Sequence, residues 1–306
     1  MPEGPSGLTV FIESIARAQL TTVMIVMVIA TVVRVGAILG RERTYGLNAK
    51  VFHILADLAD AVIYAGILVF MVIRPFVLQT FWIPSESMEQ TLLKGDYLVV
   101  NKAVYRTRDP KAGEIVVFRA PDEALTPGQP VGKTDFIKRC IGTPGMRIEI
   151  RDEGGGKYRL YRDGKPVDEQ YLGSPIPAAF KVVKIDPSKL LPSELAWLRD
   201  HWRKDLPDYV TLQRVVQIDP FTQENVEFTT VLMQTLIGEG RELGDKLWSL
   251  PAEPLPPDHY LMMGDNRSYS SDGRVWGLVQ RWRIIGRADY VFLPLSRWQV
   301  VPNNPY

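Results

Sequence analysis

Two serines in the first third of the sequence are spaced for hydrolytic chemistry. Ser85 and Ser87 are separated by one residue, so in an extended segment both hydroxyls point to the same side. One hydroxyl can attack a carbonyl carbon while the other donates a hydrogen bond to the oxyanion that forms. A Ser-x-Ser pair is also common in solvated loops and at helix caps, so this pair needs support from elsewhere in the chain.

A lysine within an apolar segment offers the base that such a serine requires. In DFIKRC, read as a strand, Lys138 shares one face with Phe136 and Cys140, while Arg139 points to the other face. Apolar neighbours disfavour the charged amine and lower its pKa, and a neutral amine can act as a general base near neutral pH. The alternative is an ordinary solvated lysine at a sheet edge.

A third segment, GDNRSYSSDGRVWG at 264–277, is a turn-rich loop with several hydroxyls and two carboxylates, Asp265 and Asp272. The spacing differs from that of a calcium-binding EF-hand loop, and Arg267 and Arg274 would oppose a bound cation. The alternative to a functional role is a structured loop with internal salt bridges.

The composition argues against metal, cofactor and nucleic-acid chemistry. Cys140 is the only cysteine, and the three histidines, His53, His201 and His259, are far apart in the sequence. Neither residue type shows metal-ligand spacing, so we expect no metal and no cofactor. The net charge of +1 provides no basic excess for binding nucleic acid.

Two apolar stretches near the N-terminus are long enough to cross a bilayer. The first has 23 residues and the second ends with Phe81 and Trp82, aromatic residues that suit a membrane interface. Lysine and arginine are more frequent between the stretches than before them, so the positive-inside rule places the connecting loop in the cytoplasm. The predicted organisation is an external segment (1–17), a first transmembrane helix (18–40), a cytoplasmic loop (41–60), a second transmembrane helix (61–82) and an external domain (83–306).

The external domain reads as mainly β structure. Short runs rich in β-branched and aromatic residues alternate with turn signals, as in DYLVVN, EIVVFR and DFIKRCI. A helix is predicted from Ser193 to about Lys204. The stretch at about 173–257 looks like an insertion. Its role is open among shielding the domain, docking on lipid through Trp197 and Trp202, and contacting a partner.

Four ordered sequence boxes, PSESMEQTLLKGDYLVVNK, GEIVVF, KRCIGTPGM and GDNRSYSSDGRVWG, resemble those of bacterial type I signal peptidase (leader peptidase). The resemblance implies a mainly β external catalytic domain with antiparallel sheets, similar to signal peptidase and LexA, behind two N-terminal transmembrane helices. By position, Ser87 aligns with the nucleophile, Lys138 with the general base and Ser85 with the side-chain donor of the oxyanion hole. Supporting positions align with Ser270, which would position the lysine amine, and with Asp272, Arg139 and Asp265.

The chain departs from the family pattern at several positions. Glu114 and Met146 stand where Asp is usual, and Gly273 stands where Ser is common. Ser268 and Tyr269 replace the usual Asp-Asn. None of these changes removes a proposed catalytic group. They do change residues that would hold the loops of the site in place.

The resemblance implies a serine endopeptidase that removes signal peptides from secreted preproteins after an A-x-A-like site. Its location would be the bacterial inner membrane, with the catalytic domain on the external, periplasmic side. The expected partners are preproteins, the lipid bilayer and the secretion translocon. Two alternatives stay open: another Ser–Lys protease, such as a LexA-like self-cleaving protein, and a membrane-tethered binding or assembly module.

Overall fold

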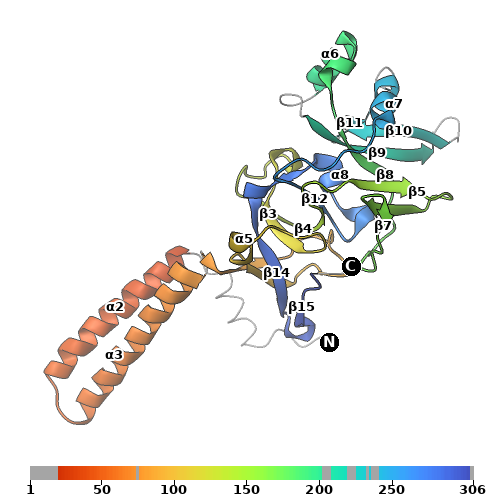
Figure 1. Cartoon of the computed structure of the whole chain (residues 1–306). Helices are drawn as coiled ribbons and strands as arrows, with labels where there is room; N and C mark the ends of the chain where they lie inside the picture. The colour runs from red at the N-terminus through yellow and green to blue at the C-terminus, as the bar shows by residue number, and fades with distance from the viewer. Residues whose placement is uncertain are drawn as a thin grey trace.

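A hairpin of two long helices projects from a β-rich body in the computed structural model of the chain (Figure 1). The structure describes residues 20–73, 76–201, 208–218, 225–231, 234–235 and 241–303. Helix α2 spans Leu20–Glu42 and helix α3 spans Leu47–Gly66, which continues as the π-helical segment η1 at Ile67–Ile73. The two helices meet closely because Gly40 lies against the ring of Phe52.

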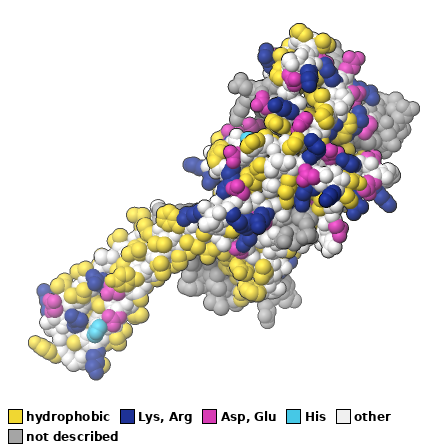
Figure 2. Space-filling model, viewed as in Figure 1, with side chains coloured by type: hydrophobic (Ala, Val, Ile, Leu, Met, Phe, Trp, Pro, Cys, Tyr) yellow, Lys and Arg dark blue, Asp and Glu magenta, His cyan; other side chains and the backbone are white. Residues whose placement is uncertain are grey.

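The surface of the hairpin is apolar along most of its length. Figure 2 shows hydrophobic side chains covering its shaft and charged ones gathered at its free end. Two helical stretches, Thr21–Glu42 and Leu47–Ile73, are long and apolar enough to cross a membrane by length and composition. Both are therefore candidate membrane spans.

The predicted second span at 61–82 is wrong at both ends. The helix begins at Leu47, inside the predicted cytoplasmic loop 41–60, and Leu78–Trp82 forms strand β1. Phe81 and Trp82 therefore pair with the neighbouring strand instead of ending a membrane helix. The polar residues that suggested a loop fit the helix because His53 bonds Asp57 one turn away and Asp60 pairs with Arg34 of α2. The predicted segment 1–17 lies outside the described residues.

Two antiparallel sheets form the body. The first has the order β1-β2-β14-β3-β4-β12-β13, with β15 paired to β14, and the second has the order β11-β10-β9-β8-β5-β6-β7. The strands of the first sheet are β1 (Leu78–Trp82), β2 (Tyr97–Asn101), β3 (Ile115–Arg119), β4 (Asp135–Gly142), β12 (His259–Met263), β13 (Val279–Gln280), β14 (Ile284–Leu293) and β15 (Gln299–Val300). Those of the second are β5 (Ile148–Asp152), β6 (Tyr158–Arg162), β7 (Lys165–Pro166), β8 (Ala179–Lys184), β9 (Tyr209–Ile218), β10 (Asn225–Val231) and β11 (Gln234–Thr235). The mainly antiparallel β architecture predicted from the sequence is confirmed.

Short helices complete the body. They are α5 (Val104–Thr107), α6 (Pro192–His201), α7 (Arg241–Ser249) and α8 (Gly273–Trp276). Helix α6 begins one residue before the predicted start at Ser193, and the predicted end near Lys204 lies outside the described residues.

The predicted insertion at 173–257 extends the second sheet. Strand β8 pairs with β5, and β9, β10 and β11 follow outward, with α6 and α7 at the same end of the molecule (Figure 1). Trp197 packs against the buried cluster that includes Leu198 and Leu247. This packing favours an internal role for Trp197 over lipid docking, while Trp202 lies outside the described residues.

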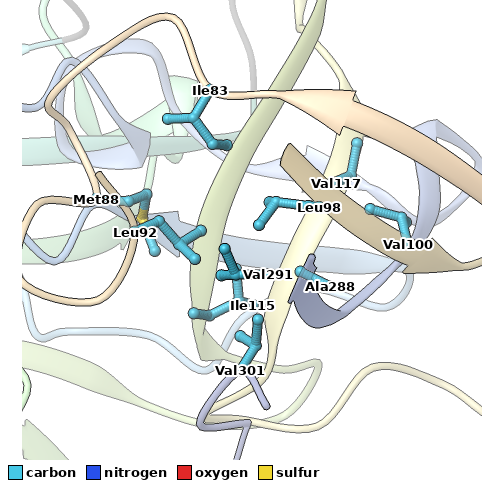
Figure 3. Packing of buried hydrophobic residues seen from close by; sticks show 10 residues of the cluster. All are labelled: Ile83, Met88, Leu92, Leu98, Val100, Ile115, Val117, Ala288, Val291 and Val301. Atoms are coloured by element: carbon cyan, nitrogen blue, oxygen red, sulfur yellow. The ribbon is translucent and has the colours of Figure 1, made fainter. Parts of the chain in front are cut away.

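A buried apolar cluster anchors the loop that carries the two serines. Ile83, Met88 and Leu92 from this loop point toward side chains of β2, β3 and β14, including Leu98 and Val117 (Figure 3). All three loop side chains are at most 2% exposed. Burying each such side chain contributes roughly 1.5–3 kcal/mol, so the loop is held in place on both sides of Ser87.

Candidate active site

The loop between β1 and β2 brings Ser87 to Lys138 of β4. The Lys138 Nζ lies 2.5 Å from the Ser87 Oγ, although the two residues are 51 positions apart in the sequence. Lys138 is 5% exposed and Ser87 is 7% exposed. The structure therefore joins two of the residues singled out from the sequence in one short, buried hydrogen bond.

Burial changes the acidity of the lysine. Loss of hydration lowers the pKa of Lys138 from 10.5 to about 8, against the opposing effect of the carboxylates of Asp272 and Asp265. The ring of Phe136 lies 5.9 Å from the Nζ, as expected for residues two apart on one strand. An amine with a pKa near 8 is neutral in about a tenth of molecules at pH 7, and in that form it can accept a proton from the serine.

Ser85 lies beside the same hydroxyl. Its Oγ is 3.3 Å from the Ser87 Oγ, and its side chain is exposed whereas Ser87 is buried. The predicted proximity of the two hydroxyls is therefore present. A donor at this position can reach an oxygen that develops negative charge next to Ser87.

A fully buried ion pair ties β4 to the loop after β12. Arg139 donates to both carboxylate oxygens of Asp265, at 2.8 and 2.6 Å, and both side chains are 0% exposed. Thr91, from the serine-bearing loop, donates to the same carboxylate at 2.5 Å. The pair therefore connects the strand of Lys138, the loop of Ser87 and the loop of Asp265.

A second buried pair lies inside the loop at 264–277. Asp272 accepts hydrogen bonds at 2.8 Å from Arg274 Nε and at 2.9 Å from the backbone N–H of Gly264. Burial alone would raise the pKa of Asp272, but Arg274 and these hydrogen bonds outweigh it and lower the pKa. The carboxylate stays charged, and it partly offsets the loss of hydration at Lys138. An internal salt bridge, which the sequence analysis gave as the alternative to a functional role for this loop, is present.

Ser270 lies close to the Ser87 backbone, and its hydroxyl does not bond to Lys138. A Cβ added at Gly264 would stand 2.3 Å from the Ser270 Oγ and 2.4 Å from the Ser87 carbonyl oxygen. The Ser270 Oγ is buried and has no hydrogen-bond partner among the described residues. The predicted role of Ser270 as a positioning group for the amine therefore stays a prediction.

The sequence analysis assigned no role in the site to several residues of this region. Gly264 leaves no room for a side chain, and Arg267 forms a buried ion pair with Glu169. Asn266 donates hydrogen bonds to the backbone on both sides of Ser87. The GDNR run could have indicated Asn266 and Arg267, but no sequence signal links Arg267 to Glu169, 98 positions earlier.

The departures from the family pattern have local explanations at two positions. A Cβ at Gly273 would stand 2.8 Å from both the Leu261 Cδ1 and the Met262 carbonyl oxygen, so this backbone has no space for serine. Glu114 is 4% exposed and accepts hydrogen bonds from Tyr105 and Arg108. The Glu114 side chain, which is longer than that of the usual Asp, thus has hydrogen-bond donors for its carboxylate.

The arrangement places a serine hydroxyl next to a buried lysine amine, and two such groups can carry out hydrolysis together. Within the described part of the chain, His, Cys, Asp and Glu form no group of three or more that could hold a metal ion. What the geometry offers is a nucleophile, a base with a lowered pKa and a neighbouring hydroxyl. These are the parts that acyl transfer through a serine requires.

Comparison with known proteins identifies the family. The model for "Signal peptidase, peptidase S26" matches residues 55–293, so the chain belongs to this family of peptidases. Signal peptidase I of Leptolyngbya laminosa is 32% identical over 74% of this chain and 73% of its own length. Probable signal peptidase I-1 of Synechocystis sp. is 29% identical over 74% of this chain and 78% of its own length.

The chain is also similar to a third relative and to a solved structure. Signal peptidase I of Pseudomonas aeruginosa is 29% identical over 76% of this chain and 72% of its own length. A crystal structure of a signal peptidase I from Enterococcus faecalis is 21% identical, covers 59% of this chain and 97% of its own, and superposes with a TM-score of 0.27. The resemblance found in the sequence is confirmed: the chain is a hydrolase of the signal peptidase family, with two apolar helices suited to anchoring it in a membrane.

Proposed function

We propose that this peptidase removes N-terminal signal peptides from exported preproteins, with Ser87 as nucleophile and Lys138 as general base. The observation that carries the proposal is the 2.5 Å contact between the Lys138 amine and the Ser87 hydroxyl in a buried setting. An ordinary surface lysine has no reason to be buried against a serine, because burial disfavours its charge.

The proposed reaction has two halves. Neutral Lys138 takes the Ser87 proton as the serine oxygen attacks the scissile carbonyl carbon, and the oxyanion receives hydrogen bonds from the Ser87 N–H and the Ser85 hydroxyl. The Lys138 ammonium then protonates the leaving amine as the C–N bond breaks, which leaves an ester on Ser87. Lys138 next removes a proton from a water molecule that attacks this ester, and the serine oxygen leaves with a proton from the amine.

We propose that the surrounding polar residues hold Ser87 and Lys138 in position. The pair Arg139–Asp265 holds the strand of Lys138 against the serine-bearing loop, and Asp272 fixes the Gly264 peptide next to Ser87. Ser270 has a free buried hydroxyl in the described structure, and we propose that it turns toward the Lys138 amine once that amine is neutral.

The substrate is proposed to reach the site along the membrane. Residues 74–77 are all that separates the helical segment ending at Ile73 from β1, and Ser87 follows Trp82 by five positions. We propose that the body lies on the external side of the bacterial inner membrane, near the translocon. A preprotein still held in the bilayer by its apolar segment would present its small-x-small cleavage site there as an added strand.

The test is cleavage of a purified preprotein by the full chain in detergent, with the product N-terminus read by mass spectrometry. We expect one cut after a small-x-small site, lost in Ser87→Ala and in Lys138→Met. Ser249→Ala and Lys184→Met, which change exposed side chains of the inserted region, are the matched controls and should cleave normally.

Three outcomes would count against the proposal. Substantial cleavage by folded Ser87→Ala would remove the serine from the mechanism. Failure of the folded wild-type chain to cut several preproteins would favour a binding or assembly module, whereas a cut within the chain itself would favour a LexA-like self-cleaving protein.

A further inference from the structure

Asn266 holds the backbone on both sides of Ser87. Its backbone N–H donates to the Ser87 carbonyl oxygen at 3.1 Å, and its side-chain Nδ2 donates to the Glu86 carbonyl oxygen at 3.2 Å. These two carbonyls belong to the two peptide units that meet at the Ser87 Cα. Asn266 is 5% exposed, so both hydrogen bonds are shielded from water.

The surroundings of the Asn266 amide define which of its atoms faces the loop. The Nδ2 lies 3.3 Å from the Glu89 Oε2 in addition to its contact with the Glu86 oxygen. Both neighbours are acceptors only, so the nitrogen and not the oxygen must face them. The Oδ1 is buried without a partner among the described residues, so the side chain is held by its donors alone.

This contact fixes the direction of the N–H of Ser87. In a trans peptide the C=O and N–H groups point in opposite directions, so holding the Glu86 oxygen aims the Ser87 N–H away from Asn266. Among the described residues, no group accepts a hydrogen bond from this N–H. It is therefore an unoccupied donor with a fixed direction next to the serine hydroxyl.

We propose that Asn266 is a positioning residue for the oxyanion hole: it clamps the Glu86–Ser87 peptide so that the Ser87 N–H points at the developing oxyanion. This inference rests on the proposed function of Ser87. It assigns Asn266 no contact with the substrate.

The loop that carries Asn266 is also held by the segment at 169–173. The Gly173 N–H donates to the Asp265 carbonyl oxygen at 3.1 Å. Next to Asn266, Arg267 forms a buried ion pair with Glu169. The segment that makes these contacts also packs against the serine-bearing loop, since Gly173 lies next to Glu89. A shift of Asn266 away from Ser87 would therefore disturb both contacts.

The experiment compares Asn266→Ala and Asn266→Asp with the wild-type full chain in detergent, using a preprotein substrate. Asn266→Ala keeps the backbone N–H that holds Ser87 but loses the Nδ2. We expect kcat to fall about 10- to 100-fold, less than the roughly 100- to 1000-fold typical for complete loss of an oxyanion donor. KM and the midpoint of the pH–rate profile should not change, because Lys138 is untouched.

Asn266→Asp is nearly the same size and places a carboxylate against the Glu86 oxygen, so kcat should fall at least as far. Asn101→Ala is the matched control. Asn101 also bonds to backbone and carboxylate groups, Val104 N–H and Asp289, but lies at the end of β2 remote from the serine-bearing loop. Its kcat should equal that of the wild type.

A peptide aldehyde probes the oxyanion position directly. Lys138 takes the Ser87 proton as the serine oxygen bonds to the aldehyde carbon and the carbonyl π bond breaks. The former carbonyl oxygen occupies the oxyanion site until it takes up that proton from the Lys138 ammonium. Inhibition by the aldehyde should weaken in Asn266→Ala by about the same factor as kcat. A wild-type kcat in folded Asn266→Ala and Asn266→Asp would overturn the inference.

The two hypotheses fail in different ways. If Ser87→Ala cleaves the preprotein, the proposed function is wrong. If Ser87→Ala is inactive while Asn266→Ala and Asn266→Asp cleave and bind the aldehyde as the wild type does, only the role of Asn266 is wrong. A pH–rate midpoint that moves in Asn266→Ala would also contradict it, because that result indicates a displaced Lys138.

Discussion

Replacing Lys138 by methionine should abolish activity and stabilise the fold. The pKa of Lys138 is lowered from 10.5 to about 8 by burial. A difference of roughly 2.5 units corresponds to about 3 kcal/mol that the folded state loses by carrying this charged amine at pH 7. Methionine has a similar unbranched shape and no charge, so it removes this cost at the loss of one hydrogen bond to Ser87, worth about 1 kcal/mol.

The pH dependence of stability follows from the same shift. Between about pH 8 and 10.5 the folded state has released the Lys138 proton while the unfolded chain still holds it. The unfolded state thus binds more protons, and the wild-type free energy of unfolding should rise with pH across this window. Lys138→Met should be about 2 kcal/mol more stable than the wild type at pH 7, and this advantage should disappear by pH 10.5.

The pH dependence of wild-type activity should follow the ionisation of Lys138. The neutral fraction of an amine with a pKa near 8 rises about tenfold from pH 6 to 7, about fivefold from 7 to 8 and less than about twofold from 8 to 9. The assays are kcat/KM with a preprotein and denaturant unfolding of the full chain in detergent, each from pH 6 to 10.5. A flat kcat/KM profile, together with a constant stability difference between Lys138→Met and wild type, would refute the reasoning.

Three substitutions test the surroundings of the dyad. Asp265→Asn should destabilise the chain by about 3–5 kcal/mol in denaturant unfolding, because it leaves Arg139 buried without its counter-charge; a change below about 1 kcal/mol would contradict this. Ser85→Ala should reduce kcat roughly 100- to 1000-fold with KM nearly unchanged in steady-state cleavage, and an unchanged kcat would remove Ser85 from the oxyanion hole. Gly264→Ala should lower kcat and cost about 1–3 kcal/mol of stability, since its Cβ would stand 2.4 Å from the Ser87 carbonyl oxygen; a wild-type melting temperature would show that the loop yields.

The sequence was sufficient for the local features of the fold and for the central pair of the site. Runs rich in β-branched and aromatic residues predicted β3 and β4, and the ordered boxes singled out Ser87 and Lys138. Both kinds of signal are local, because such runs and box motifs lie within a few consecutive residues. The bond between the two side chains became visible only in three dimensions.

Features that depend on distant partners could not be predicted. Asp60 looked like a loop residue because its partner, Arg34, lies on another helix. Arg267 was considered only as a group that opposes a bound cation, because its partner Glu169 is far away in the sequence. In both cases the position of the charged residue depends on an ion pair with a partner that is distant in the sequence.

In the proposed arrangement at the membrane, the short connection between the helical hairpin and β1 determines how far Ser87 lies from the bilayer. Strand β1 has five residues and spans about 16 Å, and its last residue, Trp82, pairs with Tyr97 just beyond the serine-bearing loop. Because a paired strand cannot stretch, the elevation of Ser87 over the end of the hairpin is set by the number of residues in β1. Lengthening β1 and β2 by two residues each would raise that elevation by about 7 Å and shift the preferred cut to preproteins with a longer polar stretch behind their apolar segment.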